Sequence, residues 1–202
     1  VYDVQSGAYE VDADVDDLDL SAVPGIPVAV MGNLSASLHV TGNSKNHSMM
    51  ATGHVTAENL SYNGLTVDAA AGDVAYDGRI VTLRSGHAEA GGGSVDVSGS
   101  YDVDSQTPHL TFTGHDLPLD MASPFVSLPL SGTADLSGHV DGSQWDVAFS
   151  ASQGQIKGVP FDSLDGTARG QGSRIEIPAL YWRRGDGTHV LTGQAAFHFA
   201  HF

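Results

Sequence analysis

Several features are scarce in this sequence, and each scarcity removes a class of protein. The chain of 202 residues has no cysteine, so disulfide bonds and thiolate chemistry are excluded. Only 8 Lys and Arg residues stand against 24 Asp and Glu residues, which gives a formal charge of -16. This imbalance argues against binding to nucleic acid or to an anionic membrane surface, because both need clustered basic side chains. No stretch approaches about 20 consecutive apolar residues, so no membrane-spanning helix is expected.

The sequence signatures of catalysis and of metal binding are missing as well. The sequence has no H-E-x-x-H pair, no G-x-S-x-G elbow and no phosphate-binding P-loop. Its 10 histidines are spread along the chain and form no close pair of the kind that ligates zinc on a helix. We therefore expect no enzyme activity, no catalytic residue, no metal site and no cofactor.

What the sequence does contain is alternation of apolar and polar residues, as in YEVDADVDDLDL (9–20). The D-x-D-x-D pattern that begins at Asp12 resembles the start of a calcium-binding loop. Such a loop needs Gly at its sixth position and Glu at its twelfth, where this chain has Asp17 and Val23. Period-two alternation instead predicts a β-strand with a solvated acidic face and an apolar face. The same pattern recurs along the chain between Gly, Asn and Asp turn signals, which predicts an all-β fold.

The chain also contains an internal repeat. Residues 64–101 align without a gap on residues 158–195 after a shift of 94 positions, with five glycines superposed. Upstream, residues 32–42 align on residues 132–142 after a slightly larger shift of 100 positions. We predict a first β-repeat over residues 1–107 and a second over 108–202, which together form one continuous β-domain in a fragment of a longer chain.

Many apolar positions in the repeats hold small residues, which leave room beside an apolar wall of the kind that an alkyl chain needs. We expect a charge at Val67 or Phe161 to reduce lipid occupancy without unfolding the domain. The predicted lipid-groove lining consists of the following residues: Val11, Ala13, Val15, Leu34, Ala36, Leu38, Val55, Ala57, Val67, Ala69, Leu110, Phe112, Ala134, Leu136, Val147, Phe149, Phe161, Leu164, Ile175, Ile177 and Phe197.

Two stretches of the second repeat resemble a known family. The segment GHDLPLDMASPFVSLPLSGTADLSGHVDG (114–142) and the strand-rich unit over residues 151–197 are similar to the C-terminal region of the TamB and AsmA-like proteins of bacterial envelopes. Residues 60–101 of the first repeat carry the pattern more loosely. The resemblance implies an elongated, curved β-sheet folded lengthwise into an open trough, called a β-taco, built here from two stacked repeats of about 95 residues.

The resemblance also implies a function and a location. Proteins of this family lie in the periplasm of diderm bacteria and are held in the inner membrane by an N-terminal anchor. Their partners are phospholipid acyl chains and an outer-membrane barrel protein of the Omp85 type, TamA or BamA. The implied function is to carry phospholipid between the inner and outer membranes, or to assist outer-membrane β-barrel assembly.

Two other classes of function fit parts of the composition. A structural or adhesive surface β-solenoid without a ligand, like an autotransporter passenger, shares the acidity and the glycine content, although its rungs repeat every 20 to 30 residues. A carbohydrate-binding β-sandwich would need an exposed aromatic platform, and Trp145 and Trp182 are the only tryptophans. An apolar interior that is open favours the trough, whereas a filled interior favours the other two.

Overall fold

The computed structural model describes residues 1–22, 30–62, 64–123, 129–172 and 174–196. Its elements are twelve β-strands and two short 3-10 turns, η1 and η2, which follow the first and seventh strands. In chain order the elements are β1 Ala8–Asp19, η1 Leu20–Ala22, β2 Val30–Asn43, β3 Ser48–Tyr62, β4 Leu65–Tyr76, β5 Ile80–Ala90, β6 Gly93–Asp102, β7 Thr107–Pro118, η2 Leu119–Ala122, β8 Leu130–Asp141, β9 Gln144–Ile156, β10 Val159–Gln171, β11 Arg174–Arg184 and β12 Gly187–Ala196.

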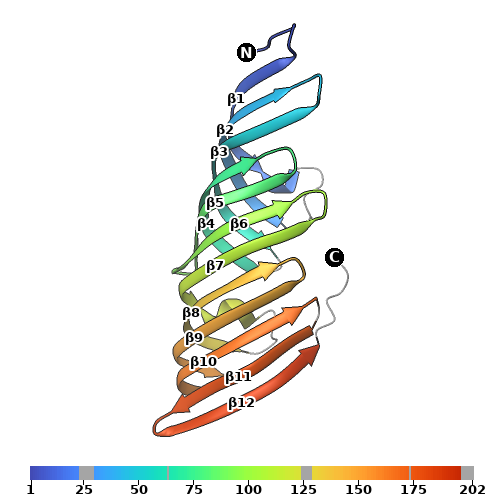
Figure 1. Cartoon of the computed structure of the whole chain (residues 1–202). Helices are drawn as coiled ribbons and strands as arrows, with labels where there is room; N and C mark the ends of the chain where they lie inside the picture. Colours follow the sequence, from blue (N-terminus) through green and yellow to red (C-terminus); the bar gives the residue numbers. More distant parts are fainter. Residues whose placement is uncertain (23–29, 63, 124–128, 173, 197–202) are drawn as a thin grey trace. The chain divides into compact units, whose positions relative to one another are not determined.

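The strands form one twelve-stranded antiparallel sheet in which the spatial order equals the chain order (Figure 1). Among the described residues, β1 and β12 each have a single neighbouring strand, so the sheet stays open rather than closing into a barrel. The predicted all-β class with an open, curved sheet is confirmed. Most connections are short turns, and a strand that reverses through a few residues pairs with the strand before it.

Contacts between Cα atoms divide the chain into two compact units. The first unit comprises Val1–Ala90 and Asp96–Pro108, and the second comprises Gly91–Val95 and His109–Phe202. The division falls close to the boundary between residues 107 and 108 at which the two sequence repeats meet.

The same backbone irregularities recur in both units. Residues with left-handed φ angles stand at matching places in the two repeats, and most lie in turns or where a strand gains one extra residue against its neighbour. An extra residue of this kind bends the strand and changes its twist. The matching pairs are Asp17 and Asp116, Gly32 and Gly132, Asn59 and Gln153, Gly64 and Gly158, and Gly78 and Gly172.

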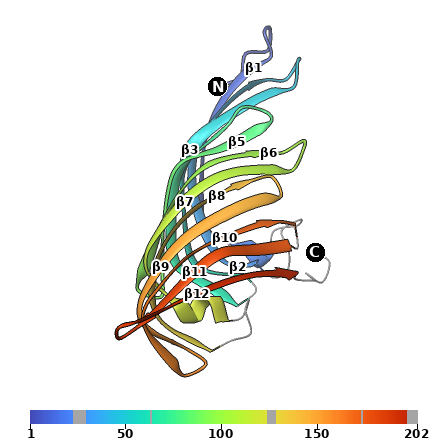
Figure 2. The ribbon, with the colours of Figure 1, turned by 60° about the horizontal axis from the view of Figure 1, so that its bottom comes forward.

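Bent strands give each unit an inner and an outer surface, and Figure 2 shows the curvature along the strands. Burial alternates along each strand. In β8, for example, half-buried and exposed residues alternate, and Ala134 is buried. Leu119 of η2 packs against the buried cluster of Ala134, Ala151, Phe161 and Leu164, so this turn lies over the apolar surface of the second unit. We call the surface that carries these residues the apolar face and the opposite surface the polar face.

Candidate functional site

The apolar face of the first unit consists of side chains in rows that run across the strands. One row passes from Val15 through Ala36 and Val55 to the glycines of β4 and β5, because each residue pairs directly with the next. Residues that face each other across antiparallel strands project to the same side of the sheet. The predicted lining residues that lie in these rows are Val11, Ala13, Val15, Leu34, Ala36, Leu38, Val55 and Ala57.

The second unit has equivalent rows. Leu136, for example, pairs with Phe149, which pairs with Gly166 on β10. The predicted lining residues that lie in these rows are Leu110, Phe112, Ala134, Leu136, Val147, Phe149, Leu164, Ile175 and Ile177.

One predicted lining residue lies on the other face. Ala69 pairs with Glu58 on one side and with Glu89 on the other, so it lies on the polar face. Its neighbour Ala70 pairs with Ala57 and Ala88 and takes the expected place on the apolar face. Left-handed Asn59, with φ of 53°, interrupts the period-two alternation at this point, and a count of alternate residues through the interruption places Ala69 wrongly.

The second unit has the equivalent left-handed residue, Gln153, and shows how this irregularity affects packing. Phe161 and Leu164 are three residues apart in β10, yet both belong to one buried cluster. Val67, the residue that aligns with Phe161, is half-buried and pairs with Leu60 just beyond Asn59. The remaining predicted lining residue, Phe197, lies outside the described residues.

The apolar face is partly open in both units. No large side chain among the described residues is fully buried, and most of the buried apolar residues are alanines. Larger members of the rows, such as Leu38, Val55 and Val147, are half-buried, and Val11 is 49% exposed. Apolar side chains that keep contact with solvent in a contiguous row can gain free energy by binding an apolar ligand.

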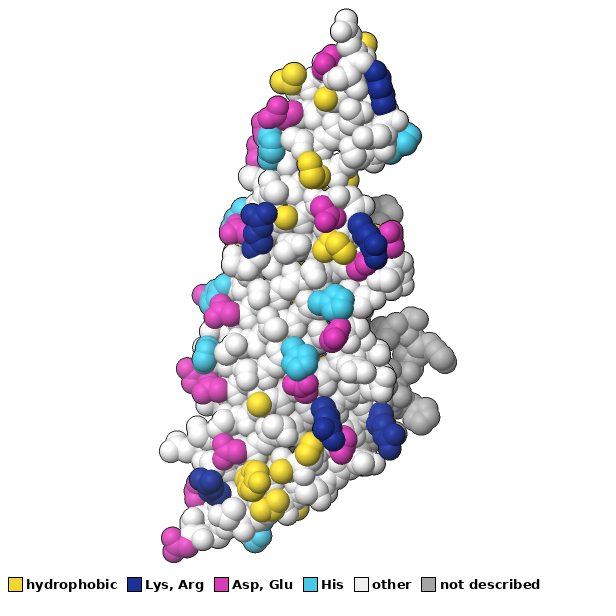
Figure 3. Space-filling model, viewed as in Figure 1, with side chains coloured by type: hydrophobic (Ala, Val, Ile, Leu, Met, Phe, Trp, Pro, Cys, Tyr) yellow, Lys and Arg dark blue, Asp and Glu magenta, His cyan; other side chains and the backbone are white. Residues whose placement is uncertain are grey.

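The polar face carries pairs of histidine and carboxylate side chains that lie across neighbouring strands. Figure 3 shows histidines beside acidic side chains on the surface that faces the viewer. The nitrogen-to-oxygen distances of these pairs lie between 2.7 and 3.6 Å, and the imidazoles are about half exposed. The pairs are His39 with Asp12 and Glu10, His54 with Asp73, His87 with Asp96, His109 with Asp141, His115 with Asp135, and His139 with Asp146.

Two of these pairs carry shifted pKa values. The hydrogen bond to Asp12 raises the pKa of His39, and the nearby charges of Asp12 and Glu10 add to the effect. The hydrogen bond from His54 lowers the pKa of Asp73, with a further contribution from Ser85. Each pair therefore links two strands most strongly when the imidazole is protonated and the carboxylate is ionised.

A separate ion pair ties together two turns of the first unit. Arg79 follows β4, and its guanidinium contacts the Asp102 carboxylate at the end of β6, with Nε at 3.0 Å from Oδ2. This contact, together with backbone N–H groups of Ser105 and Asp104, lowers the pKa of Asp102 to about 2. Asp102 is 9% exposed, and because these hydrogen bonds lower its pKa, the turn holds a buried carboxylate that stays ionised throughout the physiological range.

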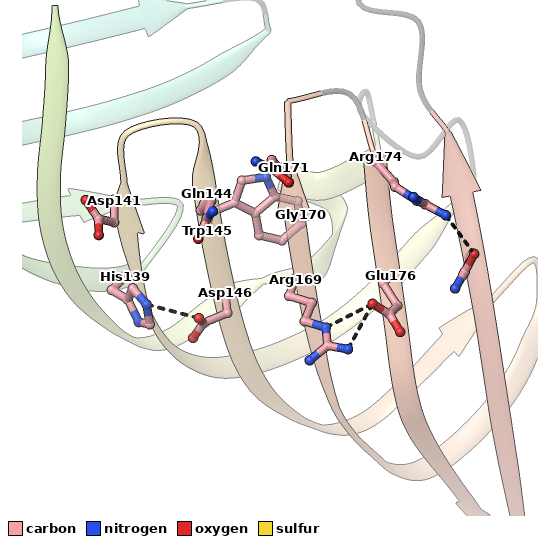
Figure 4. Close-up of a pocket in the computed structure, with 11 residues that line it drawn as sticks. His139, Asp141, Gln144, Trp145, Asp146, Arg169, Gly170, Gln171, Arg174 and Glu176 are labelled. Atoms are coloured by element: carbon pink, nitrogen blue, oxygen red, sulfur yellow. Dashed lines mark hydrogen bonds and ion pairs between the residues drawn. The ribbon is translucent and has the colours of Figure 1, made fainter. Parts of the chain in front are cut away.

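A hollow of about 480 Å³ on the polar face of the second unit was not predicted from the sequence (Figure 4). Its polar lining comes from β8 to β12 and includes His139, Asp146, Arg169, Arg174 and Glu176. A signal was present in the sequence, since Arg169 and Arg174 stand where the first repeat has Ala75 and Ile80.

The acidic pattern in β1 is part of this polar face. Asp12 accepts a hydrogen bond in its pair with His39, and Asp14 accepts one from Ser37 Oγ at 2.8 Å. The strand interpretation of residues 9–20 is thus confirmed for β1 up to Asp19.

Within the described ranges, no three His, Cys, Asp or Glu side chains gather closely enough to hold a metal ion. None of the helical segments in that part of the chain has the length and hydropathy needed to cross a membrane.

Similar proteins of known function would identify the site independently of its geometry. Comparison of the chain with family models, with curated proteins and with solved structures gives no match. The assignment of a function therefore depends on the two faces described above and on the resemblance found in the sequence.

Proposed function

We propose that the apolar face of the sheet binds the acyl chains of phospholipids. The observation that supports this proposal most directly is the contiguous row of half-buried apolar side chains in each unit, such as Leu38 and Val55 in the first. Each methylene removed from water contributes about 0.8 kcal/mol. A sixteen-carbon chain would then gain roughly 10 kcal/mol before the cost of ordering it.

The wider role follows from the resemblance to TamB and AsmA-like proteins. In this proposal the chain is a periplasmic segment that carries phospholipid between the inner and outer membranes, or assists outer-membrane β-barrel assembly with a barrel protein of the Omp85 type. The acidic polar face supports this role, because like charges on a long open sheet discourage edge-to-edge association. The proposal involves no enzyme chemistry and no cofactor.

The direct test is a charge placed on each face of the same strand. Val55→Asp puts a carboxylate among Ala36 and Gly72 on the apolar face, and Thr52→Asp puts one among exposed residues on the polar face. Purified proteins are extracted, and bound phospholipid per mole of protein is measured by mass spectrometry. We expect V55D to retain roughly one fifth of the wild-type lipid or less, because a buried charge opposes an apolar ligand, and T52D to retain all of it.

The outcome that contradicts the proposal is equal lipid content in wild type, V55D and T52D, or no phospholipid in the wild-type protein. Circular dichroism and thermal melting confirm that the variants are folded. If V55D unfolds, the nearly isosteric Val55→Thr replaces it, since a hydroxyl also disfavours an acyl chain while preserving volume.

A further inference from the structure

The two outer strands of the sheet, β1 and β12, each have a neighbour on one side only within the described part of the chain. Each of them also has an equivalent inside the sheet. A shift of 94 positions carries β6 onto β12, and a shift of 99 positions carries β1 onto β7, with the strand ends coinciding in both cases. β6 and β7 are neighbours in the sheet. The chain therefore contains, as an internal pair, the equivalents of its own two outer strands.

The equivalence extends to the backbone. Asp17 of β1 and Asp116 of β7 align, and both have a left-handed φ of 52°. Each lies where its strand gains one extra residue against the following strand, which bends the strand. Gly93 at the start of β6 lies against this bend, since a Cβ atom there would be 2.7 Å from the Asp116 carbonyl oxygen. β12 begins with the aligned glycine, Gly187, and so leaves the same space for a bent neighbour.

The side chains of the two outer strands are more exposed than those of their equivalents. Every residue of β12 from Gly187 to Gln194 is exposed, whereas Asp96 is the only exposed residue in the aligned part of β6, residues 93–100. In β1, Val11 is 49% exposed, and the aligned Leu110 of β7 is half-buried. A strand placed beside each outer strand would remove apolar surface from water and give hydrogen-bond partners to the backbone.

The two outer strands differ in charge. β1 carries six acidic residues and no basic residue, whereas β12 contains no Asp, Glu, Lys or Arg. Like charges oppose the pairing of one β1 strand with another, but they do not oppose the pairing of β1 with β12. β12 also lacks the charged residues and prolines with which edge strands usually prevent such pairing.

Basic side chains lie at the end of β12 that would meet the most acidic part of β1. Arg183 and Arg184 precede the two-residue turn into β12, are exposed, and make no ion pair with any of the residues that the structure describes. Asp186 in the turn offsets only one of the two charges. If β12 meets β1 as β6 meets β7, Gly187 lies beside Asp17, and the turn approaches the carboxylates of residues 16–19. The charges of the two surfaces are thus complementary.

We infer that β12 of one chain pairs in antiparallel fashion with β1 of a second copy, repeating between chains the arrangement that β6 and β7 have within one chain. The contact joins two different surfaces, so further copies can add in the same direction. Residues 1–3 already cover the beginning of β1, where Tyr2 bridges to Tyr9, and the strand is available from Val11 onwards. The inference is independent of the proposed lipid function, because it depends on strand pairing and not on a ligand.

The test is disulfide cross-linking between copies, which is selective because the chain has no cysteine of its own. Counting four residues along each strand from Gly187 and Asp17 places Leu191 opposite Ala13. Both project to the apolar face, and residues directly opposite in an antiparallel pair are close enough for a disulfide. Leu191→Cys and Ala13→Cys proteins are mixed and oxidised, and the linked dimers are identified by mass spectrometry. In the control mixture Thr52→Cys, exposed on the inner strand β3, replaces Ala13→Cys.

We expect the A13C–L191C dimer to exceed the T52C–L191C dimer about tenfold, because only the first pair has the geometry of a disulfide. Sedimentation velocity of the wild-type chain should show a mass that rises with concentration. Predominance of L191C homodimers would show that β12 pairs with itself and would overturn the inference, as would a wild-type chain that stays monomeric at every concentration. If A13C or L191C is unfolded by circular dichroism, Val11→Cys with Gly193→Cys replaces the pair, since nothing lies within 4 Å of a Cβ atom at Gly193.

Charge reversal tests the orientation of the contact. Arg183→Glu/Arg184→Glu, made in the L191C protein, should lower the yield of the cross-linked dimer about fivefold, because it turns attraction to β1 into repulsion. Arg84→Glu/Lys157→Glu changes the net charge equally at exposed positions outside both outer strands and should leave the yield unchanged. Equal losses in the two variants would contradict the orientation. Should R183E/R184E be unfolded, a sodium chloride titration replaces it, and a yield that does not fall with salt would contradict the role of charge.

Discussion

The two units share a backbone plan but differ in what covers their apolar faces. In the first unit one row runs from Leu34 through Ala57 and Ala70 to Ala88. In the second unit the aligned row runs from Ala134 through Ala151 and Leu164 to Trp182. The first row ends in small side chains, and the second ends in a leucine and an indole.

The larger side chains of the second unit fill part of their own apolar face. Phe161 is 2% exposed and contacts Trp182 edge to face, with ring centroids 5.9 Å apart. Phe161 belongs to a buried cluster against which Leu119, Phe149, Ile156 and Leu180 also pack. The aligned positions of the first unit hold Val67, Ala88 and Gly86, which cannot build such a cluster.

This difference shows that the fold does not depend on a bulky core. Strand pairing, left-handed turn residues and bulges recur at matching positions in both units, whereas the volume on the apolar face does not. Backbone hydrogen bonds and turn chemistry thus specify the sheet, and the apolar side chains are free to vary in size. In the proposed function, the first unit offers more room to an acyl chain than the second.

The largest expected effect comes from shortening a buried side chain in the second unit. Phe161→Ala removes a buried ring and leaves a cavity, so we expect a loss of about 3–5 kcal/mol in the free energy of unfolding. Val67→Ala at the aligned, half-buried position should cost only about 1 kcal/mol. Urea unfolding followed by far-UV circular dichroism measures both values, and tryptophan fluorescence reports the second unit, which contains both Trp145 and Trp182.

Equal losses of unfolding free energy in F161A and V67A would contradict the difference between the two units, because they would show that both apolar faces are equally filled. The buried state of Phe161 also changes an expectation from the sequence. A charge at this position would disrupt the cluster and unfold the second unit, so a charge at half-buried Val67 is the suitable probe of lipid occupancy.

A second, intermediate effect tests the room in the first unit directly. Ala88→Trp introduces the residue that the second unit has at the aligned position, and Ala88 is half-buried. We expect the free energy of unfolding of the A88W variant to stay within about 1 kcal/mol of wild type, because the indole enters open space. Ala151→Trp, at a position that is 1% exposed, should cost about 3 kcal/mol or more through overpacking.

Thermal melting and urea unfolding compare A88W with A151W under the same conditions. If A88W destabilises the protein as much as A151W does, the first unit has no free volume at this row, and this row cannot be a binding site for an acyl chain.

Most of the architecture followed from the sequence because period-two alternation and the glycine repeat are local signals. β1 follows from YEVDADVDDLDL, whose alternation predicts a strand. The repeat itself is visible because turns and close backbone approaches demand glycine at fixed positions.

The sequence could not place residues beyond an irregularity. Ala69 has the right spacing from Val67, but left-handed Asn59 on the neighbouring strand changes which side of the sheet each residue faces. Asparagine occurs often in ordinary strand ends and turns, so nothing local marks it as a point where alternation is reset. The hollow on the polar face was missed for another reason: its polar side chains come from five strands, and only pairing brings them together.

The smallest expected effect concerns the histidine–carboxylate pairs, which both units carry on their polar faces. His39 in the first unit and His139 in the second align, and each pairs with a carboxylate on a neighbouring strand. The raised pKa of His39 means that its proton is bound more tightly in the folded chain than in the unfolded chain. Its contribution to stability is therefore complete below about pH 6.5, the ordinary value, and is lost as pH rises through the folded pKa.

His39→Gln should accordingly lower the melting temperature slightly at pH 5.5 and leave it unchanged at pH 8.5. The effect is small because His39, Asp12 and Glu10 are all substantially exposed, and solvent screens their attraction. His47→Asn, in the turn after β2, is the matched control, since asparagine tolerates the left-handed φ of 58° found there. Melting curves at the two pH values, in low salt, measure the difference. A loss in H39Q that is equal at both pH values would show that the imidazole acts through packing rather than through its charge, because removal of a packing contact does not depend on protonation.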